Sequence, residues 1–313
     1  MRIIRVTSCR GAEKIFIALL ILFLAATAGC SRNSDKDTAG GHNSAGITGP
    51  EFRRIISTAP SNTEIVIGLG LGEYLIAVDK YSRGISGLPV NLTEIDFTYP
   101  DAEALVGLEP DLILMHEINY FGMADDPFKL LGNLGITVVK IPTSVSIEGI
   151  YGDIMMIAGI LGVPERGESM VRSMKDEIES VAAAAEKNTG EKAVYFEVSG
   201  TPTIVTFGQG TYINEMIELS GGKNIFADQK GWFSPSAEEI INRNPDVILV
   251  MQYPGSDPVP EIKSRREFAN LTAIREDRIF AIGSDEVSRP SQHILTALRD
   301  ISGAINQQNE AAR

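Results

Sequence analysis

The strongest constraint on the fold is a motif that the chain contains twice, once in each half. Each copy has a glutamate that is followed seven residues later by a Pro-Asp pair and then by an apolar run. The first copy joins Glu103 to Pro110, and the second joins Glu238 to Pro245. This pattern predicts a helix that leads through the Pro-Asp pair into a buried strand.

Two further stretches repeat in the same order. Residues 193–197 are similar to the strand-like residues 55–58, and residues 212–219 are similar to the helical sequence that ends at Gly70. Self-similarity over such a length predicts a duplication. We therefore expect an α/β protein with two related lobes of roughly 110 to 120 residues each.

The first lobe opens with the predicted order strand, helix, strand. An apolar run that ends at Ile56 is interrupted by Pro60. Ser61 and Glu64 have the spacing of a capping box, which predicts a helix that starts at this serine. The second strand is expected at residues 75–78. The turn after the first strand lies at its carboxyl end, where open α/β sheets bind ligands.

Two stretches of helical patterning lie between the repeats. Residues 146–161 form the first, and residues 166–187 carry apolar side chains at helical spacing without an internal proline. A helix of about 22 residues spans roughly 33 Å, so it can join two lobes as a rigid strut. An ordinary surface helix of the first lobe is the alternative. The predicted domains are a first lobe at residues 51–162, a linking helix at 163–189 and a second lobe at 190–313.

The first fifty residues have the pattern of an export signal followed by a tether. Basic residues precede an apolar run at residues 15–29 that is too short to span a bilayer. We expect residues 1–29 to be a signal peptide and the polar residues 30–50 to be a flexible tether. The small residues before Cys30 resemble a bacterial lipobox, which implies a lipid anchor at Cys30 and an extracytoplasmic location. A retained membrane anchor is the alternative.

Composition and motif content argue against several classes of function. A net charge of −13 disfavours nucleic acid and anionic membrane surfaces as main partners, because both attract positive charge. The chain has three histidines and two cysteines, of which Cys9 lies in the signal, so no Cys/His zinc spacing is present. Phosphate-loop and nucleophile-elbow motifs are absent. We therefore expect a protein that is no enzyme and holds no cofactor.

Several motifs together resemble one family. Residues 54–82, the paired glutamate and Pro-Asp motifs and the linking helix are similar to substrate-binding proteins of ABC importers for cobalamin, ferric siderophores and haem. These importers use the helical-backbone class of periplasmic binding proteins. The resemblance extends over residues 54–305. It implies two α/β lobes that are joined by one long rigid helix, with a ligand cleft between them.

The resemblance implies aromatic cleft walls, because a large flat apolar ligand is bound by stacking. Tyr81 matches a family tyrosine that stacks on the ligand. Phe97 and Trp232 each lie six residues before the motif glutamate, where a cobalamin binder has tryptophans. These equal offsets imply equivalent places that face each other across the cleft. For each of the two, a core aromatic is the alternative.

Further ligand candidates are polar or lie at strand ends. Asp285 and Arg289 occupy positions at which the family contacts the amide side chains of cobalamin, although this arginine is alternatively a helix cap or a siderophore contact. His116 is a candidate axial ligand of haem iron or cobalt, with a hydrogen-bonded structural histidine as the alternative. Pro60 and Tyr253 complete the predicted ligand set. No metal cage made by the protein is expected.

Glu103 and Glu238 match the glutamates with which the family docks on permease arginines, and solvated helix termini are the alternative. The implied partners are an ABC permease dimer with its cytoplasmic ATPase, and the protein is expected to be a monomer. Cobalamin or a related corrinoid is the predicted ligand, and a ferric siderophore or haem is the alternative. A metal-chelate-processing surface enzyme on the same fold and a scaffold or sensor with an empty cleft are alternatives from other classes.

Overall fold

The computed structural model of the protein describes residues 52–97, 100–117, 127–187 and 190–307. The predicted signal, tether and Cys30 lie outside these residues and stay predictions. Within the described residues, no helix combines the length and apolar character that a bilayer crossing requires.

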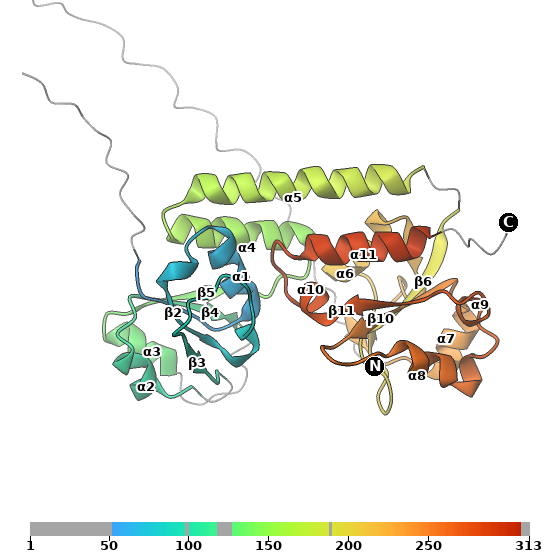
Figure 1. The fold of residues 1–313 in the computed structure, drawn as a ribbon, viewed down its shortest axis with the longest axis horizontal. Helices are drawn as coiled ribbons and strands as arrows, with labels where there is room; N and C mark the ends of the chain where they lie inside the picture. Colours follow the sequence, from blue (N-terminus) through green and yellow to red (C-terminus); the bar gives the residue numbers. More distant parts are fainter. Residues whose placement is uncertain (1–51, 98–99, 118–126, 188–189, 308–313) are drawn as a thin grey trace, which may run out of the picture. The chain divides into compact units, whose positions relative to one another are not determined.

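The first lobe is built on a five-stranded parallel sheet (Figure 1). Its strand order is β3-β2-β1-β4-β5. The chain therefore starts at the central strand β1, adds β2 and β3 on one side, and then adds β4 and β5 on the other side. The strands are β1 (Ile55–Ser57), β2 (Leu75–Asp79), β3 (Thr93–Ile95), β4 (Leu112–His116) and β5 (Thr137–Ile141). The helices are α1 (Pro60–Gly68), α2 (Ala102–Gly107) and α3 (Pro127–Asn133), with short 3-10 turns η1 (Gly72–Tyr74) and η2 (Lys80–Ser82). Burial on both faces explains the continuous apolar runs of β1 and β4.

The second lobe has a four-stranded parallel sheet in the order β11-β10-β6-β8 and a separate ribbon of β7 and β9. The strands are β6 (Lys192–Glu197), β7 (Thr206–Phe207), β8 (Gly222–Asn224), β9 (Trp232–Phe233), β10 (Val247–Gln252) and β11 (Ile279–Gly283). The helices are α6 (Tyr212–Leu219), α7 (Ala237–Arg243), α8 (Val259–Ser264), α9 (Thr272–Arg275), α10 (Ser284–Ser288) and α11 (Ile294–Asn306), with the 3-10 turn η4 (Arg266–Phe268). The repeated motif therefore produces helix and strand at α2–β4 and again at α7–β10, as predicted.

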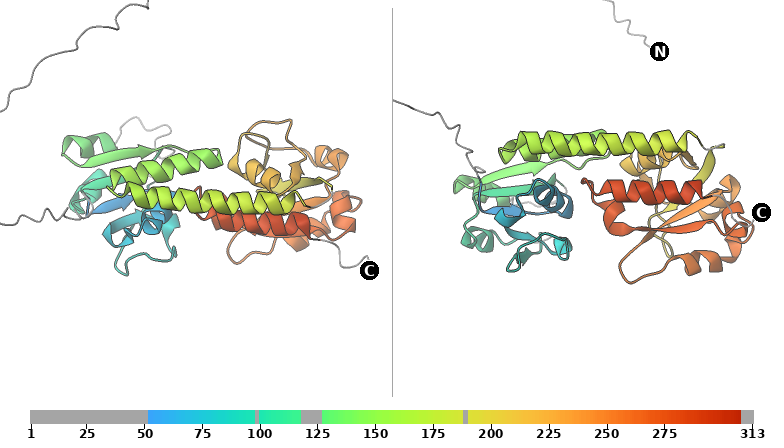
Figure 2. Two further views of the ribbon diagram at one scale, coloured as in Figure 1. Left: turned by 90° about the horizontal axis from the view of Figure 1, so that it is seen from above. Right: turned by 45° about the horizontal axis from the view of Figure 1, so that its top comes forward.

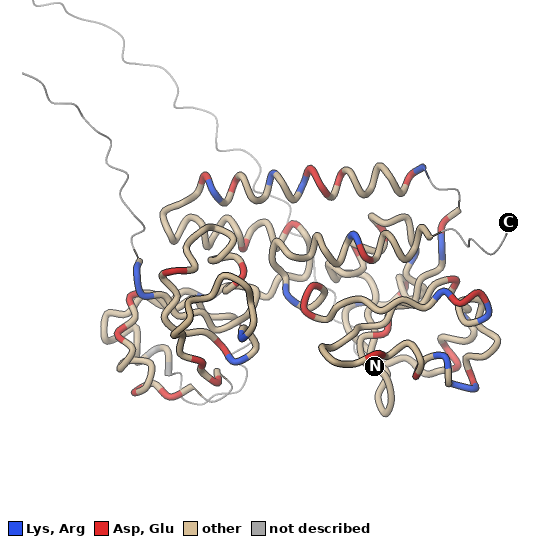
Figure 3. Tube along the Cα trace, viewed as in Figure 1, with Lys and Arg blue, Asp and Glu red and all other residues tan. Residues whose placement is uncertain are grey.

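The helices predicted between the repeats are α4 (Ile147–Ile160) and α5 (Pro164–Ala185). Helix α5 packs on α4 and extends along α11 and α6 of the second lobe (Figures 1 and 2). Near its start, Arg166 donates to the carbonyl of Leu69 at 2.8 Å, and further along Glu177 forms an ion pair with Arg299 of α11. Acidic and basic residues are interspersed along α5, as on a helix with one solvent-exposed face (Figure 3). One helix thus connects both lobes.

The largest cluster of buried apolar side chains runs through both lobes. It contains Ile55 and Leu114 of the first sheet, Phe196 and Leu249 of the second, and Met174 of α5. A continuous close-packed core of this kind resists deformation. The linking helix therefore contributes one face to the core of the protein.

The predicted capping box of Ser61 and Glu64 is wrong. The residue that caps α1 is Ala59, Pro60 is the first helical residue, and no side chain caps this end. Proline suits the first helical position because its missing N–H leaves one donor fewer to satisfy. The Glu64 side chain instead contacts the second lobe.

Candidate ligand-binding site

A pocket of about 820 Å³ lies where the carboxyl ends of strands from both sheets meet. Thr58, Lys80 and His116 mark the ends of β1, β2 and β4, and Tyr253 and Ser284 mark the ends of β10 and β11. All residues predicted to bind the ligand line this pocket: Pro60, Tyr81, Phe97, His116, Trp232, Tyr253, Asp285 and Arg289. The fold thus brings them together, and their role in binding stays a prediction.

Three aromatic side chains of the pocket are exposed to solvent. Tyr81 is 67% exposed, Trp232 is 52% exposed and Tyr253 is 54% exposed, and they come from both lobes. Trp232 is supported from one side by Phe207, whose ring it meets edge-on at a centroid distance of 5.5 Å. Exposed apolar surface of this kind favours association with a ligand. Because aromatic rings stack on flat groups, these side chains favour a flat ligand.

Phe97 differs from its counterpart Trp232. Its side chain is only 4% exposed and stacks on Phe128 with ring centroids 6.4 Å apart. It belongs to an apolar core cluster with residues of β1, β2 and β4, and it also lines the pocket. Phe97 and Trp232 both line the pocket but differ in exposure, and their facing each other across the cleft stays a prediction.

His116 is the last residue of β4, and its ring is largely withdrawn from solvent. Its backbone N–H donates to the Thr58 hydroxyl at 2.9 Å. Within the described part of the chain, its buried Nδ1 has no hydrogen-bond partner. Burial lowers the pKa of His116, so the imidazole is neutral at neutral pH. A neutral imidazole is the form that ligates metals.

The three cationic residues among the described lining of the pocket are all ion-paired. Lys80 contacts Asp96 at 2.8 Å, and Arg83 contacts Glu94 at 3.2 Å. Arg289, predicted to bind the ligand, is held by carboxylates of Glu64 at 3.0 Å and Asp285 at 2.9 Å. Its guanidinium is therefore already occupied by protein groups. An anionic ligand would have to compete with these carboxylates.

Two functional candidates were missed from the sequence, Glu64 and Asp79. The buried Asp79 accepts a hydrogen bond from the backbone N–H of Tyr81 at 2.8 Å and another from the hydroxyl of Ser82. It thereby fixes the turn that presents the Tyr81 ring. Burial raises the pKa of Asp79. Asp79 directly follows the strand predicted at residues 75–78, and this position at a carboxyl end of the sheet could have identified it as a candidate from the sequence.

Glu103 and Glu238 lie outside the pocket. Each occupies the first turn of its helix, α2 or α7, and each is exposed. Both helices lie on the side of their lobes opposite α5 (Figure 1). This placement leaves both carboxylates accessible to a partner.

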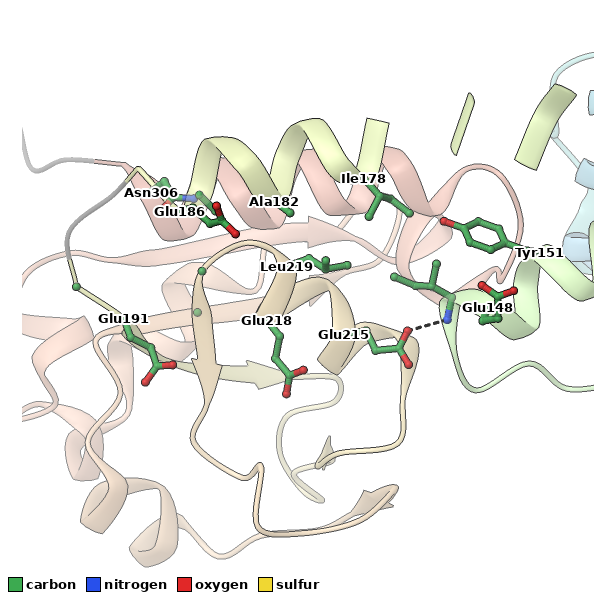
Figure 4. A pocket seen from close by; sticks show the side chains of 15 residues that line it. Glu148, Tyr151, Ile178, Ala182, Glu186, Glu191, Glu215, Glu218, Leu219 and Asn306 are labelled. Carbon is green, nitrogen blue, oxygen red and sulfur yellow. Dashed lines mark hydrogen bonds between the residues drawn. The ribbon is translucent and has the colours of Figure 1, made fainter. Parts of the chain in front are cut away.

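A second hollow, of about 810 Å³, lies between α5, α6 and the start of α4 (Figure 4). Among the described residues, five carboxylates and no lysine or arginine line it: Glu148, Glu186, Glu191, Glu215 and Glu218. Glu215 accepts a hydrogen bond from the backbone N–H of Ile147 at 2.8 Å. Among the residues that the structure describes, no three His, Cys, Asp or Glu side chains converge as a metal site. Among the described residues, the aromatic side chain that lines this hollow is Tyr151, which is buried, in contrast to the exposed rings of the first pocket.

Comparison with known proteins assigns the family. The family model for periplasmic binding proteins matches residues 55–286. The chain belongs to this family. Periplasmic binding proteins bind solutes and are not a family of enzymes. The fold of this periplasmic binding protein is the two-lobed α/β fold with a linking helix, as expected from the sequence.

Three similar proteins are informative. The lipoprotein YvrC of Bacillus subtilis, an uncharacterized ABC transporter substrate-binding protein, is 30% identical, with 82% of this chain and 80% of that protein covered. A vitamin B12-binding protein of Vibrio parahaemolyticus is 28% identical, with 79% of this chain and 87% of that protein covered. The structure of the periplasmic heme-binding protein RhuT from Roseiflexus sp. RS-1 has a TM-score of 0.70 and 26% identity, covering 81% of this chain and 97% of that one.

Proposed function

We propose that this periplasmic binding protein captures a corrinoid such as cobalamin and delivers it to an ABC permease. The observation that carries the proposal is the set of three exposed aromatic side chains, from both lobes, around one pocket. Such walls suit a large flat ring that is held by stacking from opposite sides. The pocket volume of about 820 Å³ lies in the upper part of the usual range for small-molecule sites.

The charges of the pocket favour a corrinoid over anionic ligands. A corrinoid carries mainly neutral amide side chains around its ring, whereas haem carries two propionates and carboxylate siderophores carry several negative groups. Each of Lys80, Arg83 and Arg289 is already paired with a protein carboxylate. A neutral periphery can bind beside these pairs without breaking them, and Asp285, half-exposed, can accept hydrogen bonds from amide N–H groups.

Haem is the second candidate, and His116 supports it. A neutral imidazole with an unpartnered buried nitrogen lines the pocket, which is the type of group that ligates haem iron. The similarity to RhuT points in the same direction.

Delivery requires a membrane partner and an anchor. Glu103 and Glu238 are proposed to dock on arginines of the two permease subunits, because a two-fold symmetric partner presents matching sites to two related lobes. Cys30 is proposed as the lipidated residue, in agreement with the description of YvrC as a lipoprotein. The permease dimer and its cytoplasmic ATPase would complete the importer, with a monomeric binding protein.

The ligand is tested by equilibrium dialysis of the full chain in detergent against cyanocobalamin, haemin and a ferric catecholate siderophore, each in competition with the others. We expect one cyanocobalamin per chain and displacement by neither rival. Preferential retention of haemin, with a Soret shift that is lost in His116→Ala, would assign the site to haem. Retention of the siderophore alone would equally overturn the corrinoid.

A further inference from the structure

One buried residue of the first lobe binds three residues of the second. The Glu64 side chain on α1 is 6% exposed and accepts from Arg289 Nη1 at 3.0 Å and from Ser291 Oγ at 2.5 Å. Its backbone carbonyl accepts from Gln292 Nε2 at 2.8 Å. The three donors follow α10 within one short segment, so this segment is fixed to α1.

Arg289 extends the connection to an aromatic wall of the pocket. Its second amino group contacts Asp285 at 2.9 Å and donates to the backbone carbonyl of Tyr81 at 3.4 Å. The guanidinium therefore joins Glu64 and the turn of Tyr81 in the first lobe to α10 in the second. Its side chain is only 15% exposed. The arginine that is predicted to contact the ligand thus also joins the two lobes at the pocket.

The chemistry of this contact favours a role in positioning over a role in stability. Removing a carboxylate and a guanidinium from water costs about as much as their attraction returns, so apolar packing would hold the lobes as well. Charge-assisted hydrogen bonds are directional, and they fix distances and angles that apolar contacts leave open. The distance between opposing aromatic walls must match the thickness of a flat ligand.

We infer that Glu64 is a positioning residue that acts on Tyr81 through Arg289. It holds the Tyr81 ring at a fixed distance from the aromatic side chains of the second lobe, and this distance is the one that the ligand requires. The choice of a flat ligand rests on the proposed function. The link between Glu64 and the turn of Tyr81 does not, because it consists of hydrogen bonds within the protein.

Hydrogen–deuterium exchange of the full chain without ligand tests this link. In Glu64→Gln, which keeps the size and the bond from Ser291 but removes the charge, the backbone amides of residues 80–83 should exchange several-fold faster. Glu148→Gln, the same change in the acidic hollow away from Arg289, should leave these amides unchanged. Unchanged exchange in Glu64→Gln would overturn the inference even if the protein bound no corrinoid.

A double-mutant cycle on the dissociation constant for cyanocobalamin tests the effect on binding. Glu64→Gln should weaken binding about tenfold, as is usual for coupled neighbouring groups. In a Tyr81→Ala background the same substitution should have less than a twofold effect, because its target is gone. Full additivity would show a general structural role and overturn the inference. If Glu64→Gln does not fold, Ser291→Ala replaces it, with an expected weakening of about threefold and the same non-additivity.

Discussion

In the first lobe, Phe97 stacks on Phe128 and is 4% exposed, whereas Trp232, at the corresponding place in the second lobe, is 52% exposed. The difference comes from the surroundings. Helix α3 supplies the ring that covers Phe97, while the β7–β9 ribbon supports Trp232 through the edge contact of Phe207. A duplication therefore repeats the position of a residue, and the local neighbours decide whether it packs in the core or meets a ligand.

The buried acids Glu197, Asp79 and Asp153 also differ in their neighbours, because only some buried carboxylates have an arginine beside them. In the second lobe, Glu197 is 1% exposed and accepts two bonds of 2.7 Å from Arg265. In the first lobe and α4, the donors to Asp79 and Asp153 among the described residues are N–H and hydroxyl groups, such as Ser144 at 2.5 Å from Asp153. Burial raises the pKa of both aspartates. An arginine compensates the charge of Glu197, as Arg289 does for Glu64, whereas Asp79 and Asp153 have no such counter-ion among the described residues and should be sensitive to pH.

The largest effect on stability is expected at the ion pair of Glu197 and Arg265. Arg265→Met leaves the Glu197 carboxylate buried without its counter-ion, and should lower the free energy of unfolding by about 3–5 kcal/mol. Urea unfolding followed by circular dichroism measures it. Lys263→Met, which removes an exposed partner of Asp277, should cost less than about 1 kcal/mol. Equal losses in the two variants would contradict the account.

The aromatic counterparts should separate stability from binding. Phe97→Ala opens a cavity against Phe128 and should lower the free energy of unfolding by about 3–5 kcal/mol. Trp232→Ala removes a half-exposed ring and should cost about 1 kcal/mol or less. The same urea experiment compares them. A larger loss of unfolding free energy in Trp232→Ala than in Phe97→Ala would contradict the assignment of Phe97 to the core and of Trp232 to the pocket wall.

Asp153 should make stability depend on pH. Its pKa is raised in the folded state, so between its unfolded value near 4 and its raised value the unfolded chain loses the proton first. The stability that this group contributes is complete below that range and is lost as the pH rises through it. The free energy of unfolding of Asp153→Asn should therefore increase relative to wild type from pH 4 to pH 7. A constant difference over this range would show that the carboxyl titrates normally.

The smallest effects are expected at the exposed glutamates of the two lobes. Glu103→Gln and Glu238→Gln should each weaken binding to the permease several-fold, mainly by slowing association, and the effect should shrink in high salt. Surface plasmon resonance with the reconstituted permease measures it, with Glu148→Gln as the control. A loss in only one of the two variants would argue against docking by both lobes.

The sequence predicted the elements well because their signals are local. The Pro-Asp motif, the apolar runs of β4 and β10 and the periodicity of α5 each lie within one short stretch. The packing between distant residues could not be read in this way. Phe97 is buried by a helix that follows it, and Glu64 is bound by Arg289, 225 residues further along the chain. Local spacing suggested a capping box for Glu64, and the tertiary contact decided otherwise.

For the pocket, the lining residues could be predicted from the sequence, but their ion pairs could not. Strand ends and the family resemblance supplied its eight candidate residues, because parallel strands bring their carboxyl ends to one edge. The resemblance could not supply the partners of Arg289, since ion pairs between lobes depend on how the lobes pack. It also left the ligand open, because the charge balance of a pocket is set by such pairs.

The most direct test of the account is the affinity of cyanocobalamin for the full chain with Trp232 substituted, measured by calorimetry. If the exposed ring of the second lobe is a ligand wall, Trp232→Ala should raise the dissociation constant by about thirtyfold or more, as removal of a central aromatic contact usually does. Trp232→Phe, which keeps an aromatic ring, should raise it only several-fold. An unchanged dissociation constant in Trp232→Ala would place the ligand elsewhere and contradict the central claim.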